Sequence, residues 1–208
     1  MKEILKYTVQ EKLKPVGLSE ISDAQINDHW SLYVGYVNQL NRLNDDLIQL
    51  TNDKQQNSLI YADRRRRLCF EYNGMVLHEY YFGNLCPKNI ALQPGALRQA
   101  IEKCWGSFEC WQEAFANTGK TRGIGWAILY MDTATGQLIN TFVKEHENGN
   151  IASFVPLLVM DVWEHAYMVD HKSGGRADYI NAFFLNINWN VVENRYNEAI
   201  NKKISCRF

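Results

Sequence analysis

The spacing of hydrophobic positions predicts that the first half of the chain is helical. From residue 22 onward, apolar residues recur every three or four positions, which is the spacing of one helix face. The residues on this face are Ile26, Trp30, Tyr33, Val37 and Leu40. Ser22 or Asp23 is a suitable N-cap for this helix. Further helices are predicted from near Asn57 to the Cys86–Pro87 pair and over residues 95–119.

The pattern changes in the second half of the chain. Residues 125–146 contain two β-rich runs around the turn sequence TATG, and residues 152–161 form a third apolar run that would pair with them. Residues 177–203 return to a helical pattern. Helices, then a small antiparallel sheet, then helices predict an α+β fold. We expect an N-terminal helical hairpin domain over residues 1–90 and a C-terminal domain over residues 91–208, with a three-stranded antiparallel sheet and flanking helices.

The composition shows that the chain can build a large core, and its charge gives no reason to expect certain classes of binding partner. Of the 208 residues, 46% are hydrophobic, and the formal net charge is −1. This balance gives no reason to expect binding to nucleic acid or to an anionic membrane surface, and no apolar run is long enough to span a bilayer. The five cysteines show no CxxC spacing, so neither a disulfide framework nor a thiolate zinc site is expected. The N-terminus lacks a secretory signal pattern, and we expect a cytoplasmic protein.

Histidine and aspartate residues supply the candidate chemistry. Four of the five histidines lie in apolar or aromatic surroundings, and Asp161 ends the third apolar run. These histidines are His29, His78, His146 and His165. Three imidazoles and one carboxylate form a nitrogen-rich set that suits iron, manganese or zinc, and the gap between Asp161 and His165 can place both on one side of a helical turn. The ordinary alternatives are a core histidine satisfied by one hydrogen bond and an aspartate that caps a helix, and spacing alone does not show that the histidines meet.

Five segments resemble, in order, the motifs of one known enzyme family. They are GYVNQLN at 35–41, YNGMVLHEYYFGNL at 72–85, GIGWA at 123–127, DVWEHAY at 161–167 and NINWNVVENRY at 186–196. DVWEHAY matches the most diagnostic sequence of the iron/manganese superoxide dismutases, and the other segments fall at spacings similar to those of that family. The resemblance extends from about residue 20 to residue 196, and the chain is identified as a member of the family on these motifs.

The resemblance implies a metal centre and a reaction. The reaction is the disproportionation of superoxide to dioxygen and hydrogen peroxide, with one iron or manganese ion per subunit. The ligands that the resemblance implies are His29, His78, Asp161 and His165. Tyr36 would stand in the funnel through which the anion enters, and Trp126 and Trp163 would form part of an aromatic wall around the metal.

The resemblance also implies a homodimer, and such dimers could pair into tetramers. In the family, the glutamate of WEHAY reaches across the subunit interface to the partner's ligand histidine. Glu164 would therefore support the site of the other subunit, and Tyr167 would line the same interface.

The sequence departs from the family pattern around the first ligand. The family places that histidine eight residues before the tyrosine of the funnel, but Asp28 stands eight residues before Tyr36 and His29 stands seven before it. We expect His29 to be the ligand, because Asp28 would change the ligand type and the charge of the site, and we expect the helix to lack a single-residue bulge there. The residue one turn later, usually histidine, would be Tyr33.

A second departure concerns a glutamine that hydrogen-bonds the solvent at the metal in this family. The helix position that can supply it is Gly74, and the strand position falls on His146. We expect His146 to take this role, since a neutral imidazole can hydrogen-bond there, and the alternative is a solvent-exposed histidine in the charged sequence KEHENG. These departures leave two alternatives to an active dismutase, which are a metal-binding homologue with little turnover and an iron protein with other oxygen chemistry.

A cluster of positive charge lies in the second helical stretch. Arg64–Arg67 is a run of four arginines. A solvated helix face is the simpler interpretation, and a patch that attracts the substrate anion is the alternative.

Overall fold

The chain folds into helices, an antiparallel sheet and further helices, which confirms the predicted α+β class. The computed structural model describes residues 5–88 and 90–201. The helices of the N-terminal half are η1 (Glu11–Leu13), α1 (Asp23–Asn52) and α2 (Leu59–Gly83). The strands are β1 (Gly125–Asp132), β2 (Leu138–Lys144) and β3 (Phe154–Asp161). The helices of the C-terminal half are α3 (Ala96–Trp105), α4 (Phe108–Gly119), η2 (Glu164–Ala166), α5 (Met168–His171), α6 (Arg176–Leu185) and α7 (Trp189–Asn201).

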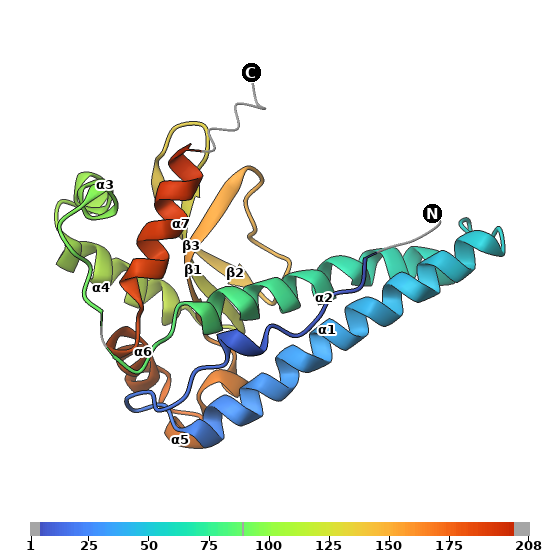
Figure 1. Ribbon diagram of the computed structural model, residues 1–208, viewed down its shortest axis with the longest axis horizontal. Coiled ribbons are helices and arrows are strands. Elements are labelled where there is room, and N and C mark those ends of the chain that lie inside the picture. The colour runs from blue at the N-terminus through green and yellow to red at the C-terminus, as the bar shows by residue number, and fades with distance from the viewer. Residues whose placement is uncertain (1–4, 89, 202–208) are drawn as a thin grey trace.

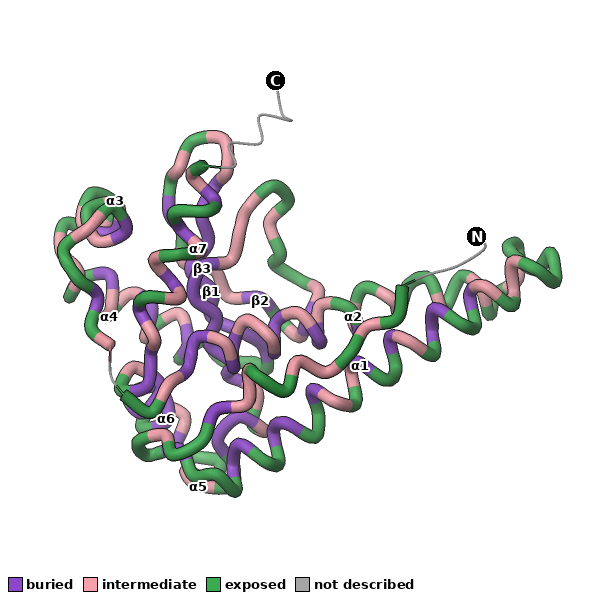
Figure 2. Tube along the Cα trace, in the orientation of Figure 1, coloured by how far each residue is buried: buried purple, intermediate pink, exposed green. Residues whose placement is uncertain are grey.

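Helices α1 and α2 form a long hairpin that projects from the rest of the molecule (Figure 1). Each is preceded by an N-cap serine whose hydroxyl accepts a hydrogen bond from a backbone N–H of the first turn, and these serines are Ser22 and Ser58. The far end of the hairpin is largely exposed, whereas buried residues gather where its base meets the sheet (Figure 2). The base of the hairpin therefore holds the side chains that can reach the sheet.

The sheet has the strand order β2-β1-β3, with β1 in the middle. Every residue of β1 is buried, which explains why its sequence is a nearly continuous apolar run. Both neighbouring strands pair antiparallel to β1, and the register places Trp126 opposite Val143 on one side and Asp161 on the other. The end of β3 is thereby fixed beside the start of β1.

Two of the predicted helices are each divided in the structure. The helix predicted over residues 95–119 is broken at Gly106, which has a φ of 86° and ends α3, and Ser107 then caps α4. The helix predicted over residues 177–203 is split between α6 and α7, where Asn188 donates its backbone N–H to the backbone oxygen of Asn84. Residues 202 and 203 lie outside the described part of the chain.

A buried hydrogen-bond network joins the hairpin to the sheet. Asn84, at the end of α2, donates to the backbone oxygen of Val159 at 2.6 Å and accepts from Arg195 of α7 at 2.6 Å. Arg195 also donates to the backbone oxygen of Leu157 at 2.9 Å. Burial lowers the pKa of the Arg195 guanidinium to about 10, which leaves it charged at neutral pH. The network fixes the end of α2 against β3, and these two elements carry candidate metal ligands.

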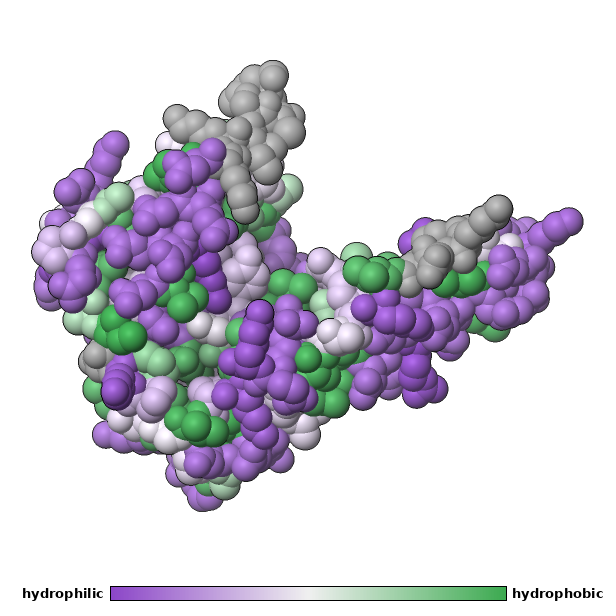
Figure 3. All heavy atoms as spheres, in the orientation of Figure 1, coloured by the Kyte–Doolittle hydropathy of each residue, from purple (hydrophilic) through white to green (hydrophobic). Residues whose placement is uncertain are grey.

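The surface carries hydrophobic residues in small groups between hydrophilic ones (Figure 3). None of the helices in the described part of the chain combines the length and hydrophobicity that crossing a membrane requires.

Candidate metal centre

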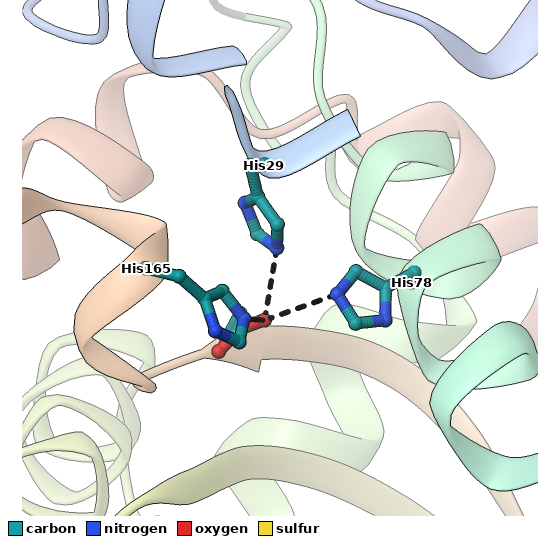
Figure 4. Close-up of side chains that lie close together, drawn as sticks. His29, His78 and His165 are labelled. Carbon is teal, nitrogen blue, oxygen red and sulfur yellow. Dashed lines mark hydrogen bonds and ion pairs between the residues drawn. The ribbon is translucent and has the colours of Figure 1, made fainter. Parts of the chain in front are cut away.

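Four side chains that are far apart in the sequence converge at the base of the hairpin. His29, His78, Asp161 and His165 each direct one potential ligand atom to a common point, and these atoms lie within 4.8 Å of one another. Figure 4 shows the three imidazoles arranged around the carboxylate, with His29 and His78 entering from α1 and α2. The first three side chains are fully buried, and His165 is 18% exposed.

Helix α1 brings His29 rather than Asp28 to the cluster. Residues 23–52 form one uninterrupted α-helix, so the helix contains no bulge between these residues and Tyr36. His29 shares the buried face of Ile26 and Trp30, and its Nε2 lies 3.1 Å from Oδ2 of Asp161, whereas Asp28 is exposed.

Backbone contacts orient the second imidazole. Nδ1 of His78 lies 2.6 Å from the backbone oxygen of Gly74, so Nδ1 bears the hydrogen and donates it. The unprotonated Nε2 then faces the cluster, 3.8 Å from Oδ2 of Asp161, and is buried with no hydrogen-bond partner in the described part of the chain. An orphaned buried nitrogen aimed at a carboxylate and two imidazoles is what a metal site needs, because a bound cation would satisfy it.

The residues after β3 supply the carboxylate and the third imidazole. The backbone N–H of Trp163 donates to Oδ1 of Asp161 at 2.8 Å, which leaves Oδ2 directed at the histidines. His165 lies in the short helix η2, and its Nε2 is 3.2 Å from the same Oδ2. Its backbone oxygen accepts a 2.7 Å hydrogen bond from Gln25, which ties η2 to α1.

The protonation states of the cluster suit a metal cation. Burial lowers the pKa of His29, and it lowers the pKa of His78 well below its ordinary value. Burial pushes the pKa of the Asp161 carboxyl upward, but the nearby His165 and His29 outweigh this effect and the pKa falls below its usual range. Neutral nitrogens and an ionised oxygen are the forms that bind metals, and this donor set fits a borderline first-row ion such as iron or manganese.

A second group of side chains packs next to the ligand rings. His146 is buried, so the alternative of a solvent-exposed histidine is wrong. Its Nε2 is 2.8 Å from the Tyr36 hydroxyl, and its Nδ1 accepts from the indole N–H of Trp126 at 3.0 Å. The ring also stacks on Trp163, with 5.0 Å between ring centroids. Burial lowers the pKa of His146 to about 4, so the ring is neutral at physiological pH.

The same group contains a contact that sequence reasoning missed. Phe70 of α2 packs edge-on against the His146 ring, with centroids 4.5 Å apart. Phe70 stands two turns before His78 on the same helix, and this spacing could have indicated that both side chains lie on the same helix face.

Tyr33 lies beside the ligands, but its hydroxyl is used elsewhere. Its ring stacks on His78, with 6.4 Å between centroids. The hydroxyl donates to Glu79 at 2.9 Å and accepts from the backbone N–H of Gln10 at 3.0 Å. Tyr33 thus packs against a ligand and anchors the segment before α1, and its hydroxyl makes no contact with the ligand atoms.

The two predicted interface residues differ in exposure. Glu164 is exposed next to His165, and no hydrogen bond or ion pair holds its carboxylate within the described residues. Tyr167 is buried and stacks on Tyr179, and its hydroxyl accepts from Arg176 at 3.3 Å.

The arginine run lies on α2, and several of its members are engaged in ion pairs. Arg64 contacts Asp46 and Asp63, and Arg67 contacts Glu71 at 2.7 Å. Ion pairing with these acids offsets part of the positive charge.

Replacing Gly74 with alanine should lower activity, because the new Cβ would lie 2.6 Å from a ring carbon of Tyr36. The ring must move, so we expect turnover to fall by about 10-fold, with the metal content unchanged. Gly35→Ala is the matched control, since nothing lies within 4 Å of a Cβ there. It should keep full turnover and gain up to about 1 kcal/mol of stability from helix propensity. Full activity of Gly74→Ala in a turnover assay would contradict this prediction.

Comparison with known proteins agrees with the geometry. A family profile described as iron/manganese superoxide dismutases, C-terminal domain, matches residues 93–195. A protein named superoxide dismutase (Fe) from Aquifex aeolicus is 37% identical over 201 residues, which cover 94% of this chain and 93% of the relative. A superoxide dismutase (Fe) from Sulfolobus acidocaldarius is 35% identical over 95% of this chain and 93% of its own length. Superoxide dismutase (Mn) 2 from Haloferax volcanii is 31% identical over 83% of this chain and 84% of its own length. This chain belongs to the iron/manganese superoxide dismutase family.

Proposed function

We propose that this protein is a superoxide dismutase that uses one iron or manganese ion per subunit. The observation that carries the proposal is the convergence of three imidazole nitrogens and one carboxylate oxygen in a buried cluster of a chain from this family. The ligands that we propose are His29, His78, Asp161 and His165. Relatives named for iron and for manganese both match the chain, so either ion is compatible with the comparisons.

The bound ion supplies the one-electron chemistry by which two superoxide anions and two protons become dioxygen and hydrogen peroxide. The residues of the chain set the charge of the site and orient the ligand atoms. Asp161 is the one anionic ligand of the cluster, so a divalent or trivalent cation leaves the site with net positive charge, which attracts an anion. The hydrogen bond from Nδ1 of His78 to the backbone oxygen of Gly74 holds Nε2 toward the cluster. The hydrogen bond from the backbone N–H of Trp163 to Oδ1 of Asp161 likewise holds Oδ2 toward it, so both ligand atoms are oriented before any ion binds.

The side chains that pack next to the ligands keep a hydroxyl proton near the site and limit the access of water to it. The Tyr36 hydroxyl is half-buried in contact with His146, and burial raises its pKa, so it stays protonated and able to donate. Trp126 and Trp163 surround His146 with apolar surface, which limits the water that can reach the ligand atoms. We assign Tyr36 to the entry path of the anion. The sequence predicts a hydrogen bond from His146 to the solvent at the metal, but both ring nitrogens are already engaged by Trp126 and Tyr36. We therefore assign His146 to the support of that tyrosine.

We further propose a cytoplasmic homodimer in which Glu164 reaches the partner's site. The exposed, unpaired carboxylate of Glu164, next to the ligand His165, supports this assignment. The unpaired state of Cys69, Cys86, Cys104 and Cys110 fits a reducing compartment. The match of the C-terminal-domain profile to residues 93–195 supports domains at 1–90 and 91–208. Dimers could pair into tetramers.

The test is a turnover assay on purified protein loaded separately with iron and with manganese. We expect one ion per chain, rapid removal of superoxide with at least one of the ions, and loss of activity after chelation. Stable binding of an ion with no turnover would contradict the catalytic proposal and favour a metal-binding homologue. Oxygen consumption with an added co-substrate would favour other iron–oxygen chemistry.

A further inference from the structure

The ring of His146 is held by hydrogen bonds at both nitrogens. The indole Nε1 of Trp126 lies 3.0 Å from Nδ1, and the Tyr36 hydroxyl lies 2.8 Å from Nε2. The ring is fully buried, and the Tyr36 and His146 rings meet at 86° with centroids 4.9 Å apart. Neither nitrogen is therefore free to hydrogen-bond a further group without giving up its present partner.

The chemistry of tryptophan decides the direction of both hydrogen bonds. An indole N–H can only donate, so Nδ1 of His146 must accept and cannot carry a hydrogen. A neutral imidazole has one hydrogen on its two nitrogens, which places it on Nε2. Nε2 therefore donates to the Tyr36 oxygen, and the tyrosine is the acceptor in this pair.

The hydrogen of the Tyr36 hydroxyl is consequently left for another acceptor. The described residues offer that hydroxyl no second hydrogen-bond partner, and the Tyr36 ring lies against His78, with centroids 5.1 Å apart. With the other tautomer of His146, the hydroxyl would instead donate its hydrogen bond to Nε2.

We propose that Trp126 is a positioning residue that fixes the Nε2–H tautomer of His146 and thereby keeps the Tyr36 hydroxyl available as a donor toward the metal site. In this arrangement His146 acts on the site through Tyr36. The role in turnover rests on the proposed dismutase function, but the tautomer itself does not.

The test measures the tautomer directly by nitrogen NMR. Full-length protein carrying ¹⁵N-labelled histidine is loaded with zinc, which is diamagnetic and accepts the same nitrogen and oxygen ligands. His146→Gln identifies the His146 signals by their loss. We expect a one-bond N–H coupling at Nε2 of His146 and none at Nδ1. A hydrogen on Nδ1 in the unmodified protein would overturn the proposal.

Three variants separate the influence of Trp126 from that of its neighbours. Trp126→Phe removes the indole donor and should move hydrogen occupancy from Nε2 toward Nδ1. Tyr36→Phe removes the other partner and should leave the tautomer unchanged. Phe70→Leu alters packing on the same ring without touching a hydrogen bond, so it is the matched control and should also leave the tautomer unchanged. A tautomer that follows Tyr36 instead of Trp126 would overturn the proposal, and this comparison remains decisive if Trp126→Phe does not fold.

Turnover of the iron- or manganese-loaded variants provides the second measurement. We expect Trp126→Phe to lose about 10-fold or more, and Phe70→Leu to lose clearly less. Equal losses in both variants would show a packing role and overturn the positioning role. If the unmodified protein has no turnover but its tautomer depends on Trp126 as expected, the tautomer assignment stands and the proposed function fails.

Discussion

Replacing His29 with alanine is expected to abolish metal retention and turnover, whereas replacing its neighbour Asp28 should leave both unchanged. His29 directs Nε2 to the cluster from the buried face of α1, and Asp28 points to solvent. Groups behind metal ligands already change affinity or activity by about 10–100-fold, so loss of a ligand should cost more than about 100-fold. Exposed substitutions such as Asp28→Ala usually change stability by less than about 0.5 kcal/mol.

The measurement is the metal content per chain after loading and dialysis, together with superoxide turnover. His29→Gln serves as a second variant, because it keeps a polar side chain of similar volume and separates loss of a ligand from a cavity in the core. A His29→Ala protein that retains its metal would show that another residue is the first ligand. Loss of metal from Asp28→Ala would place the carboxylate in the site after all.

The helical hairpin could be predicted because the apolar period of α1 matches its buried face. Ile26, Trp30 and Tyr33 are spaced by four and three residues, and all are buried. The break between α3 and α4 was missed because the apolar spacing continues across it. The residues that mark the break are the adjacent pair Gly106, which adopts a positive φ at the end of α3, and Ser107, which is the N-cap of α4.

The convergence of the candidate ligands could not be derived from spacing. His29 and Asp161 are 132 residues apart, and their meeting depends on long-range contacts such as the hydrogen bonds of Asn84 to β3 and to Arg195. The family motifs supplied the expectation that periodicity could not. The direction of the Tyr33 hydroxyl was not predictable either, because its partners Gln10 and Glu79 belong to other segments.

Removal of the metal is expected to leave a protein that loses stability in mild acid. In the unfolded chain, histidines take up protons below about pH 6.5, whereas burial lowers the pKa of His29 and of His78 in the folded, metal-free protein, so these two rings take up protons less readily there. The unfolded state therefore binds more protons as the pH falls, so the free energy of unfolding decreases. Between about pH 7.5 and about pH 5.5, this effect lowers the free energy of unfolding by at most about 1.4 kcal/mol for each ring.

The measurement is denaturant unfolding of chelator-treated protein across this pH range. His78→Leu removes one of the two buried rings and should lose part of the pH dependence, because the remaining effect comes from His29. His171→Gln, at a half-buried histidine outside the cluster, is the control variant, and its pH dependence should stay closer to that of the unmodified protein than the pH dependence of His78→Leu does. A free energy of unfolding that does not change between the two pH values would mean that these imidazoles take up protons inside the fold. Bound metal should add about 2.7 kcal/mol at neutral pH when the ion is present at about 100 times its Kd, and this gain should vanish in acid because protons compete for the same nitrogens.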